Sequence, residues 1–158
     1  MSKLLLLFLL LVTLGACGKK ENSNTDYGKH AKDESKEVDK TSSYDSSRGE
    51  GKFDKVDLAL KLNQAMAIEG ERIAEVKCTS CHKPTEERLV GPGWKGVTSR
   101  KKPVWIMNFI TNPDPMIDKD PEVQAQLEIC LVRMPNQGLN EAEARNILEY
   151  MRKIDGVK

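Results

Sequence analysis

Hydrophobic residues are distributed very unevenly along the chain. An almost unbroken apolar run fills residues 4–14, and a strongly polar stretch without a hydrophobic period follows from residue 18 to about 55. Regular apolar positions return only after residue 57. A polar stretch of this composition cannot bury enough apolar surface to offset the entropy lost on ordering. We therefore predict a disordered tether within residues 17–56 and one folded domain over residues 57–158.

Apolar positions in the folded part recur with the spacing of α-helices. Helices are predicted over about residues 63–77, 102–111 and 120–133, and from 140 onward. Asn63 and Asp120 are residue types that cap helix starts, and residues 140–143 come close to a capping box. The prolines at 113 and 115 should end the second helix. Since every element predicted in the domain is a helix, we expect an all-α domain.

The amino terminus has the pattern of an export signal. Lys3 precedes the apolar run, which is too short to span a bilayer as a mature helix. Leu14-Gly15-Ala16-Cys17 then resembles the lipobox of bacterial lipoproteins, in which cleavage leaves the cysteine as the new amino terminus and lipid is added to it. We predict a signal peptide over residues 1–16 and an acylated Cys17. The alternative is an ordinary signal peptide that contains a cysteine, which would leave an unpaired thiol in an oxidising compartment.

A lipid on Cys17 would hold the folded domain on the periplasmic side of a membrane. Asp, which in some bacteria retains lipoproteins at the inner membrane, does not follow Cys17, and this favours the outer membrane over the cell membrane. A flexible tether over residues 18–55 would have a root-mean-square span of about 35 Å. The domain could therefore swing between partners near the membrane.

Overall composition excludes some functions. The chain of 158 residues has 25 Lys and Arg against 24 Asp and Glu, so no strong net charge points to nucleic acid or to acidic substrates. Aromatic residues make up only 5% of the chain, which is too little for a large core along the whole length.

The most informative motif is Cys78-Thr79-Ser80-Cys81-His82, the pattern of c-type haem attachment. Each thiol can form a thioether to the porphyrin, and the imidazole of His82 can reach the iron. A zinc site would need four nitrogen or sulfur ligands, and the chain has only one other His, His30, in a polar stretch. A redox dithiol of the thioredoxin type would be expected near a βαβ pattern. We therefore predict one covalently attached haem c.

The surroundings of this motif resemble the mitochondrial and bacterial cytochrome c family, as a small monohaem member. Gly70 lies eight residues before Cys78, where the family has a glycine that lets the first and last helices cross closely. Ala74 stands where the family often has an aromatic residue. The loop around Gly91 and Pro92 resembles the family's Gly-Pro-x-Leu-x-Gly loop, with Trp94 in place of the leucine. The resemblance implies a cytochrome c fold and a hydrogen bond from His82 to the carbonyl of Pro92.

The resemblance also implies a second iron ligand. Met134, followed by a proline, matches the family's axial methionine, whose soft thioether binds iron opposite the histidine. The other methionines of the domain compete for this role, namely Met66, Met107, Met116 and Met151. In relatives a Trp or Arg in the region of the helix predicted over residues 102–111 can bond a haem propionate, which makes Arg100 and Trp105 candidates. Tyr150 matches an aromatic of the last helix, and Cys130 is interpreted as a small buried hydrophobe.

Two axial ligands would leave no open iron position for a substrate. We therefore expect an electron carrier rather than an enzyme, passing single electrons between a respiratory complex and a terminal oxidase or reductase, with no small-molecule substrate and no nucleic acid as partner. Lys77, Lys83 and Lys95 could form a surface for docking redox partners. The alternative is a haem sensor or peroxidase-like enzyme in which Met134 dissociates or never binds.

Overall fold

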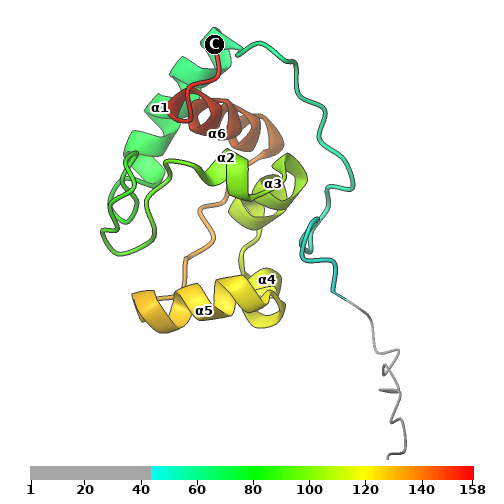
Figure 1. Cartoon of the computed structure of the whole chain (residues 1–158), viewed down its shortest axis with the longest axis vertical. Coiled ribbons are helices and arrows are strands. Elements are labelled where there is room, and N and C mark those ends of the chain that lie inside the picture. The colour runs from blue at the N-terminus through cyan, green and yellow to red at the C-terminus, as the bar shows by residue number, and fades with distance from the viewer. Residues whose placement is uncertain (1–43) are drawn as a thin grey trace, which may run out of the picture. The chain divides into compact units, whose positions relative to one another are not determined.

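The computed structural model describes residues 44–158. The predicted signal peptide and Cys17 lie outside this range. Six helices occur in it: α1 (Gln64–Lys77), α2 (Val97–Arg100), α3 (Pro103–Thr111), α4 (Asp114–Lys119), α5 (Pro121–Cys130) and α6 (Glu141–Ile154) (Figure 1). Between residues 44 and 158 the only β pairing is an isolated bridge between His82 and Arg88, so the prediction of an all-α domain is confirmed. No helix in the same range has the length and apolar character that crossing a membrane requires.

The predicted helix starts are confirmed by their capping hydrogen bonds. The side chain of Asn63 accepts a bond from the backbone N–H of Met66 at the start of α1. At the start of α6, Asn140 and Glu143 form a complete capping box, each side chain accepting from the other's backbone N–H. These bonds satisfy N–H groups that have no partner within the helix.

Helix ends differ from the sequence prediction in two places. The prolines that end α3 also open the short helix α4, because proline is tolerated in the first helical turn, where its missing N–H is not needed. Helix α5 ends at Cys130 rather than near residue 133, because Leu131 adopts a left-handed conformation with φ 58°. An irregular segment over residues 131–139 therefore separates α5 from α6.

Helices α1 and α6 cross in close contact (Figure 1). A Cβ added to Gly70 would lie 1.9 Å from the backbone oxygen of Asn146 and 2.9 Å from the backbone nitrogen of Ile147. Only glycine allows the two backbones to approach this closely. Ala74, one turn further along α1, lies on the same face of the helix as Gly70 and is fully buried.

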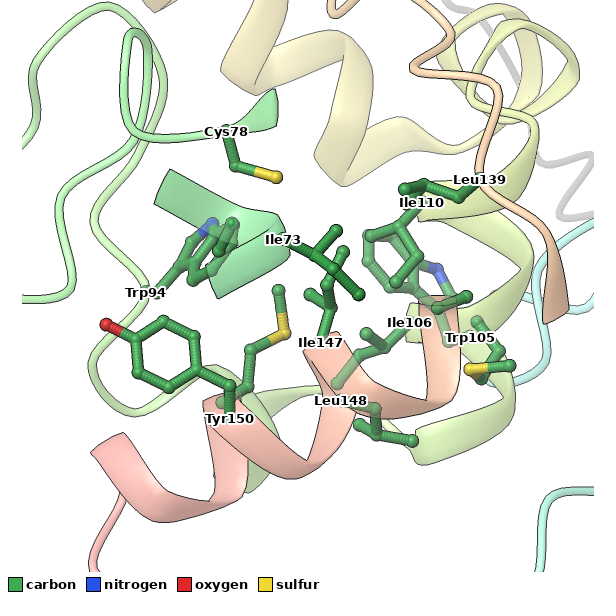
Figure 2. Packing of buried hydrophobic residues seen from close by; sticks show 14 of the residues in the cluster. Ile73, Cys78, Trp94, Trp105, Ile106, Ile110, Leu139, Ile147, Leu148 and Tyr150 are labelled. Atoms are coloured by element: carbon green, nitrogen blue, oxygen red, sulfur yellow. The ribbon is translucent and has the colours of Figure 1, made fainter. Parts of the chain in front are cut away.

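The core lies between this helix pair and α3. Figure 2 shows Ile73 of α1 beside Ile147 of α6, with Ile106 of α3 close by. Trp94 packs edge-on against Tyr150 of α6, with the ring centroids 6.2 Å apart. Tyr150 therefore contacts the loop that follows the Cys-x-x-Cys-His motif.

Residues 44–63 precede α1 and form a strap along the domain, coloured cyan to teal in Figure 1. Phe53 is buried, and its backbone N–H and C=O both bond the side-chain amide of Asn108 in α3, at 2.9 and 3.0 Å. Tyr44 donates to the carboxylate of Asp120 at 2.7 Å. At the other end of the strap, Arg152 of α6 donates to the backbone oxygen of Ala59 at 2.6 Å.

The strap corrects the prediction that residues up to 56 form an unpacked tether. Residues 44–56 have few apolar side chains, but their polar groups find buried partners on α3 and at the start of α5. The entropy cost of ordering is offset by these hydrogen bonds and by burial of Phe53. A composition argument does not detect such partners, because they lie far away in the sequence.

Replacing Gly70 by Ala should destabilise the domain strongly, because the new Cβ would overlap backbone that cannot move independently. We expect a loss of about 3 kcal/mol in the free energy of unfolding, the upper part of the usual range for overpacking. Gly138→Ala is the control: its Cβ would meet no atom within 4 Å, but φ is +62°, so only backbone strain of about 1 kcal/mol is expected. Denaturant titrations of both variants measure the difference. Equal losses would contradict a steric role for Gly70.

Candidate functional site: an apolar cavity beside the Cys-x-x-Cys-His motif

A cavity of about 420 Å³ opens beside the end of α1. Its walls come from the loop after α1, from α3, from α5, from residues 132–139 and from α6. The lining is mainly apolar and includes Val97, Ile106, Phe109, Val123, Leu127 and Leu139. A large apolar cavity with a few polar groups converging on it is the usual form of a cofactor site.

The Cys-x-x-Cys-His motif forms a tight turn at the end of α1. Cys78 caps the helix, and its backbone N–H donates to Ala74 at 2.8 Å. The N–H groups of Cys81 and His82 then both donate to the backbone oxygen of Cys78, at 3.0 and 2.9 Å. The turn brings both thiols and the imidazole to the cavity wall. Figure 2 shows Cys78 at the edge of the core, near Ile73 and Trp94.

His82 is oriented by the loop that follows the motif. Its Nδ1 lies 2.8 Å from the backbone oxygen of Pro92. Because a carbonyl can only accept, Nδ1 carries the proton, and Nε2 keeps a free lone pair. Burial lowers the pKa of His82, and the hydrogen bond to Pro92 opposes that shift without cancelling it. The ring is therefore a neutral imidazole suited to binding a metal through Nε2.

Close backbone approaches hold this loop against the imidazole. A Cβ added to Gly91 would lie 2.4 Å from Cε1 of His82, and the N–H of Gly91 donates to the backbone oxygen of Cys81 at 2.9 Å. Trp94, which replaces the leucine of the family pattern, packs with its ring centroid 5.7 Å from that of His82. The glycine allows the contact with His82, and the tryptophan covers the imidazole from the side of α6.

Two methionines line the cavity. Met134 reaches it from the irregular segment after α5 and is half-buried, and Met151 reaches it from α6. Met107 and Met116 are fully buried but do not line the cavity, and a Cβ on Gly49 would meet the Sδ of Met116 at 2.8 Å. Met66 is not part of the lining either. Of the five methionines of the domain, only Met134 and Met151 therefore remain as candidates for the second iron ligand.

Three further residues differ in part from their sequence interpretation. Trp105 lines the cavity, but its indole N–H is bonded to Asp120 at 2.9 Å and is not free for a propionate. Arg100 also lines the cavity and donates to the backbone oxygen of Lys95 at 3.1 Å. Cys130 is only half-buried and forms part of the cavity wall, not of the closed core.

Sequence reasoning missed the contribution of α5 to the site. Val123, Leu127 and Cys130 all line the cavity. Their spacing of four and three residues places them on one helix face, so a signal was present. That this face of α5 points into the cavity follows only from the fold.

The residues present fit a covalently held haem. Two thiols, a neutral imidazole and a thioether reach one apolar cavity, and the glycine at 91 leaves space for the imidazole that a Cβ would fill. Burial raises the pKa of Cys78 to about 11, which disfavours the thiolate that disulfide exchange requires. Between residues 44 and 158, no group of three or more His, Cys, Asp or Glu side chains is placed to hold a metal ion.

Comparison with known proteins also supports a covalently held haem. The family model for cytochrome c matches residues 67–155. Cytochrome c from Rhodothermus marinus is similar in structure, with a TM-score of 0.64 and 36% identity over 66% of this chain and 90% of that chain. An engineered form of that protein bound to a carbene intermediate has a TM-score of 0.60 and 35% identity over the same shares. No curated protein sequence matches the chain.

Replacing Gly91 by Ala should displace the imidazole of His82, because the new Cβ would lie 2.4 Å from Cε1. We expect the bond between His82 and the haem iron to weaken by about tenfold or more, as for other losses of an orienting partner. A partly high-spin visible spectrum of the haem-containing protein would report this. Gly96→Ala is the control, since its Cβ would meet only the flexible guanidinium of Arg100, and its φ of +81° adds backbone strain of about 1 kcal/mol without a contact to His82. An unchanged spectrum in the Gly91 variant would show that the loop does not orient the ring.

Proposed function

Because this chain belongs to the cytochrome c family, whose members bind haem c covalently and generally transfer electrons, we propose that it carries single electrons between a respiratory complex and a terminal oxidase or reductase. One observation carries the proposal. Cys78, Cys81, His82 and Met134 come from two separate segments and line the same apolar cavity.

Each of these residues has a distinct part in the proposed site. Cys78 and Cys81 would form the thioether bonds, and His82 would bind the iron through Nε2 while Pro92 holds Nδ1. Met134 would bind the iron through its thioether sulfur. The haem supplies reversible one-electron chemistry, and ligation by methionine and histidine raises its reduction potential. The apolar walls from α3 and α5 limit the access of water to the site.

If His82 and Met134 both bind the iron, no position would be left for a substrate to bind it. We therefore propose a carrier and not an enzyme. The three lysines expected to dock partners give this proposal little support. Lys77 is 3.2 Å from Glu143, Lys83 is 2.7 Å from Glu87, and the amine of Lys95 donates to the backbone oxygen of Ile154. Two of the three lysines are therefore paired with carboxylates within the domain, and the third is engaged by a backbone carbonyl.

A second candidate function is a haem sensor or a peroxidase-like enzyme. Met134 lies on an irregular segment in which Leu131 and Val132 are exposed, so its bond to iron has little packing to protect it. The engineered Rhodothermus marinus cytochrome c holds a carbene intermediate. If Met134 dissociates readily, the iron of this chain would accept a gas or a peroxide.

The proposed location rests on the amino-terminal sequence. The apolar run at residues 4–14 and the lipobox-like residues up to Cys17 support export and lipid attachment. Export also suits haem attachment, which members of the family undergo outside the cytoplasm. We place the domain on the periplasmic side of the cell membrane or outer membrane, held by lipid on Cys17.

Replacing Met134 by Ala should remove the thioether ligand. We expect the reduction potential to fall by on the order of 0.1 V, part of the range of about 0.8 V that axial ligands span. Potentiometry and the visible spectrum measure the change. Met151→Leu is the matched control, since Met151 also lines the cavity and leucine has a similar volume. If the control loses the ligand and the Met134 variant keeps it, Met151 is the true ligand.

Carbon monoxide distinguishes the two candidate functions in the unmodified protein. A closed carrier should bind it slowly and incompletely in the ferrous state, because Met134 must leave first. Rapid and complete binding would favour the sensor or peroxidase and rule out the carrier.

Replacing Cys17 by Ser should release the protein from membranes, because a serine cannot receive the lipid. Cell fractionation followed by mass spectrometry of the amino terminus measures both the location and the modification. Cys130→Ser changes a cysteine within the domain and should leave the protein in the membrane fraction. A Cys17 variant that still sediments with membranes would refute the lipid anchor.

A further inference from the structure

Asp120 is the most highly connected buried side chain near the cavity. It is fully buried between α4 and α5 and accepts four hydrogen bonds. Its Oδ2 accepts from the hydroxyl of Tyr44 at 2.7 Å and from the indole N–H of Trp105 at 2.9 Å. Its Oδ1 accepts from the backbone N–H groups of Glu122 and Val123, at 2.9 and 3.2 Å. One carboxylate thus joins the strap, α3 and α5.

The groups bonded to Asp120 belong to the cavity wall. Trp105 lines the cavity from α3, and Val123 lines it from the first turn of α5. Helix α5 continues to Cys130, only four residues before Met134. The position of α5 against α3 therefore influences where the segment with Met134 begins.

A second contact restrains the same tryptophan from another direction. The amine of Lys101 lies 4.3 Å from the centroid of the Trp105 ring and 2.8 Å from the carboxylate of Glu122. Trp105 also stacks on Phe109, with the centroids 5.0 Å apart. The ring is thus held by its face and by its N–H, and both restraints connect to the start of α5.

The arrangement requires a carboxylate. Burial by itself raises the pKa of Asp120, but the hydrogen bonds from Tyr44, Trp105 and Val123 outweigh it and leave the pKa below its usual value. An ionised carboxylate accepts on both oxygens, whereas an asparagine would present a donor on one side. Asparagine at 120 could still cap α5 through its oxygen, but its NH₂ would face donors.

We propose that Asp120 is a positioning residue for the bond between Met134 and the haem iron: it fixes α5 against α3 and so holds the segment that carries the methionine at the cavity. This inference rests on the proposed function, because it takes Met134 as the axial ligand. It adds that the strap takes part, through Tyr44, in keeping Met134 bound to the iron.

The test compares Asp120→Asn with Tyr44→Phe, Asp120→Ala and a control, all in the full-length haem protein. The Asp120→Asn variant keeps the side-chain cap of α5 but removes the oxygen that accepts hydrogen bonds from Tyr44 and Trp105. Phe removes only the Tyr44 hydroxyl and should fold even if Asp120→Ala does not. Asn63→Ala is the control: it removes the side-chain cap of α1, whose bond to Met66 is 3.1 Å, without touching α3 or α5.

Three measurements report the effect. They are the ferric absorption band of the iron–thioether bond, the rate of carbon monoxide binding to ferrous protein, and hydrogen exchange of the amides of α5. In Asp120→Asn we expect roughly tenfold faster carbon monoxide binding and roughly tenfold faster exchange in α5, since two donors lose a charged partner. Tyr44→Phe should give a smaller change of the same sign, about threefold. Asn63→Ala should leave all three readings as in the wild type.

The outcomes distinguish a failure of the proposed function from a failure of the positioning role of Asp120. If wild-type protein lacks the iron–thioether band, the proposed function and the role of Asp120 both fail. If the band is present and Asp120→Asn and Tyr44→Phe bind carbon monoxide at the wild-type rate, the positioning role alone is overturned. Faster carbon monoxide binding in Asn63→Ala equal to that in Asp120→Asn would also overturn it, because any loss of stability would then suffice.

Discussion

The close crossing of α1 and α6 at Gly70 is the contact on which the rest of the domain depends. It places the end of α1 beside α6, near Tyr150. The turn formed by the Cys-x-x-Cys-His motif, which begins at Cys78, therefore lies next to the packed core. Trp94 can then lie between His82 and Tyr150. Because backbone meets backbone at this crossing, neither helix can shift without moving the other. The motif that binds the cofactor thus follows directly on a helix whose backbone packs against the backbone of α6.

The opposite side of the cavity is built differently. Helices α4 and α5 are short, the segment after α5 is irregular, and Met134 is only half-buried. Buried apolar surface is limited there, and polar contacts such as those of Asp120 take its place. The two sides match two needs of the proposed carrier. In that proposal the side of His82 is held by backbone packing, whereas the segment that carries Met134 would need such polar contacts to stay at the cavity.

The strap connects these two sides. Its start bonds Asp120 near α5, its middle packs Phe53 against α3, and its end is held by Arg152 of α6. Tyr44, the first residue of the strap, therefore lies at the start of α5 and not at the start of α1.

Local chemistry determined much of this protein without any structure. The Cys-x-x-Cys-His motif, the caps at Asn63 and Asn140 and the glycine at 70 each act within a few residues or through one required residue type, so the all-α fold and the cofactor could be predicted. Only the tertiary structure decided that residues 44–56 pack, that α5 ends at Cys130, and that Met134 and Met151 alone among the domain's methionines reach the cavity. These features depend on partners distant in sequence, as when Tyr44 meets Asp120 across 76 positions. A hydrogen bond or packing contact of that kind leaves no periodic pattern in the chain, because its two halves are brought together only when the whole domain folds.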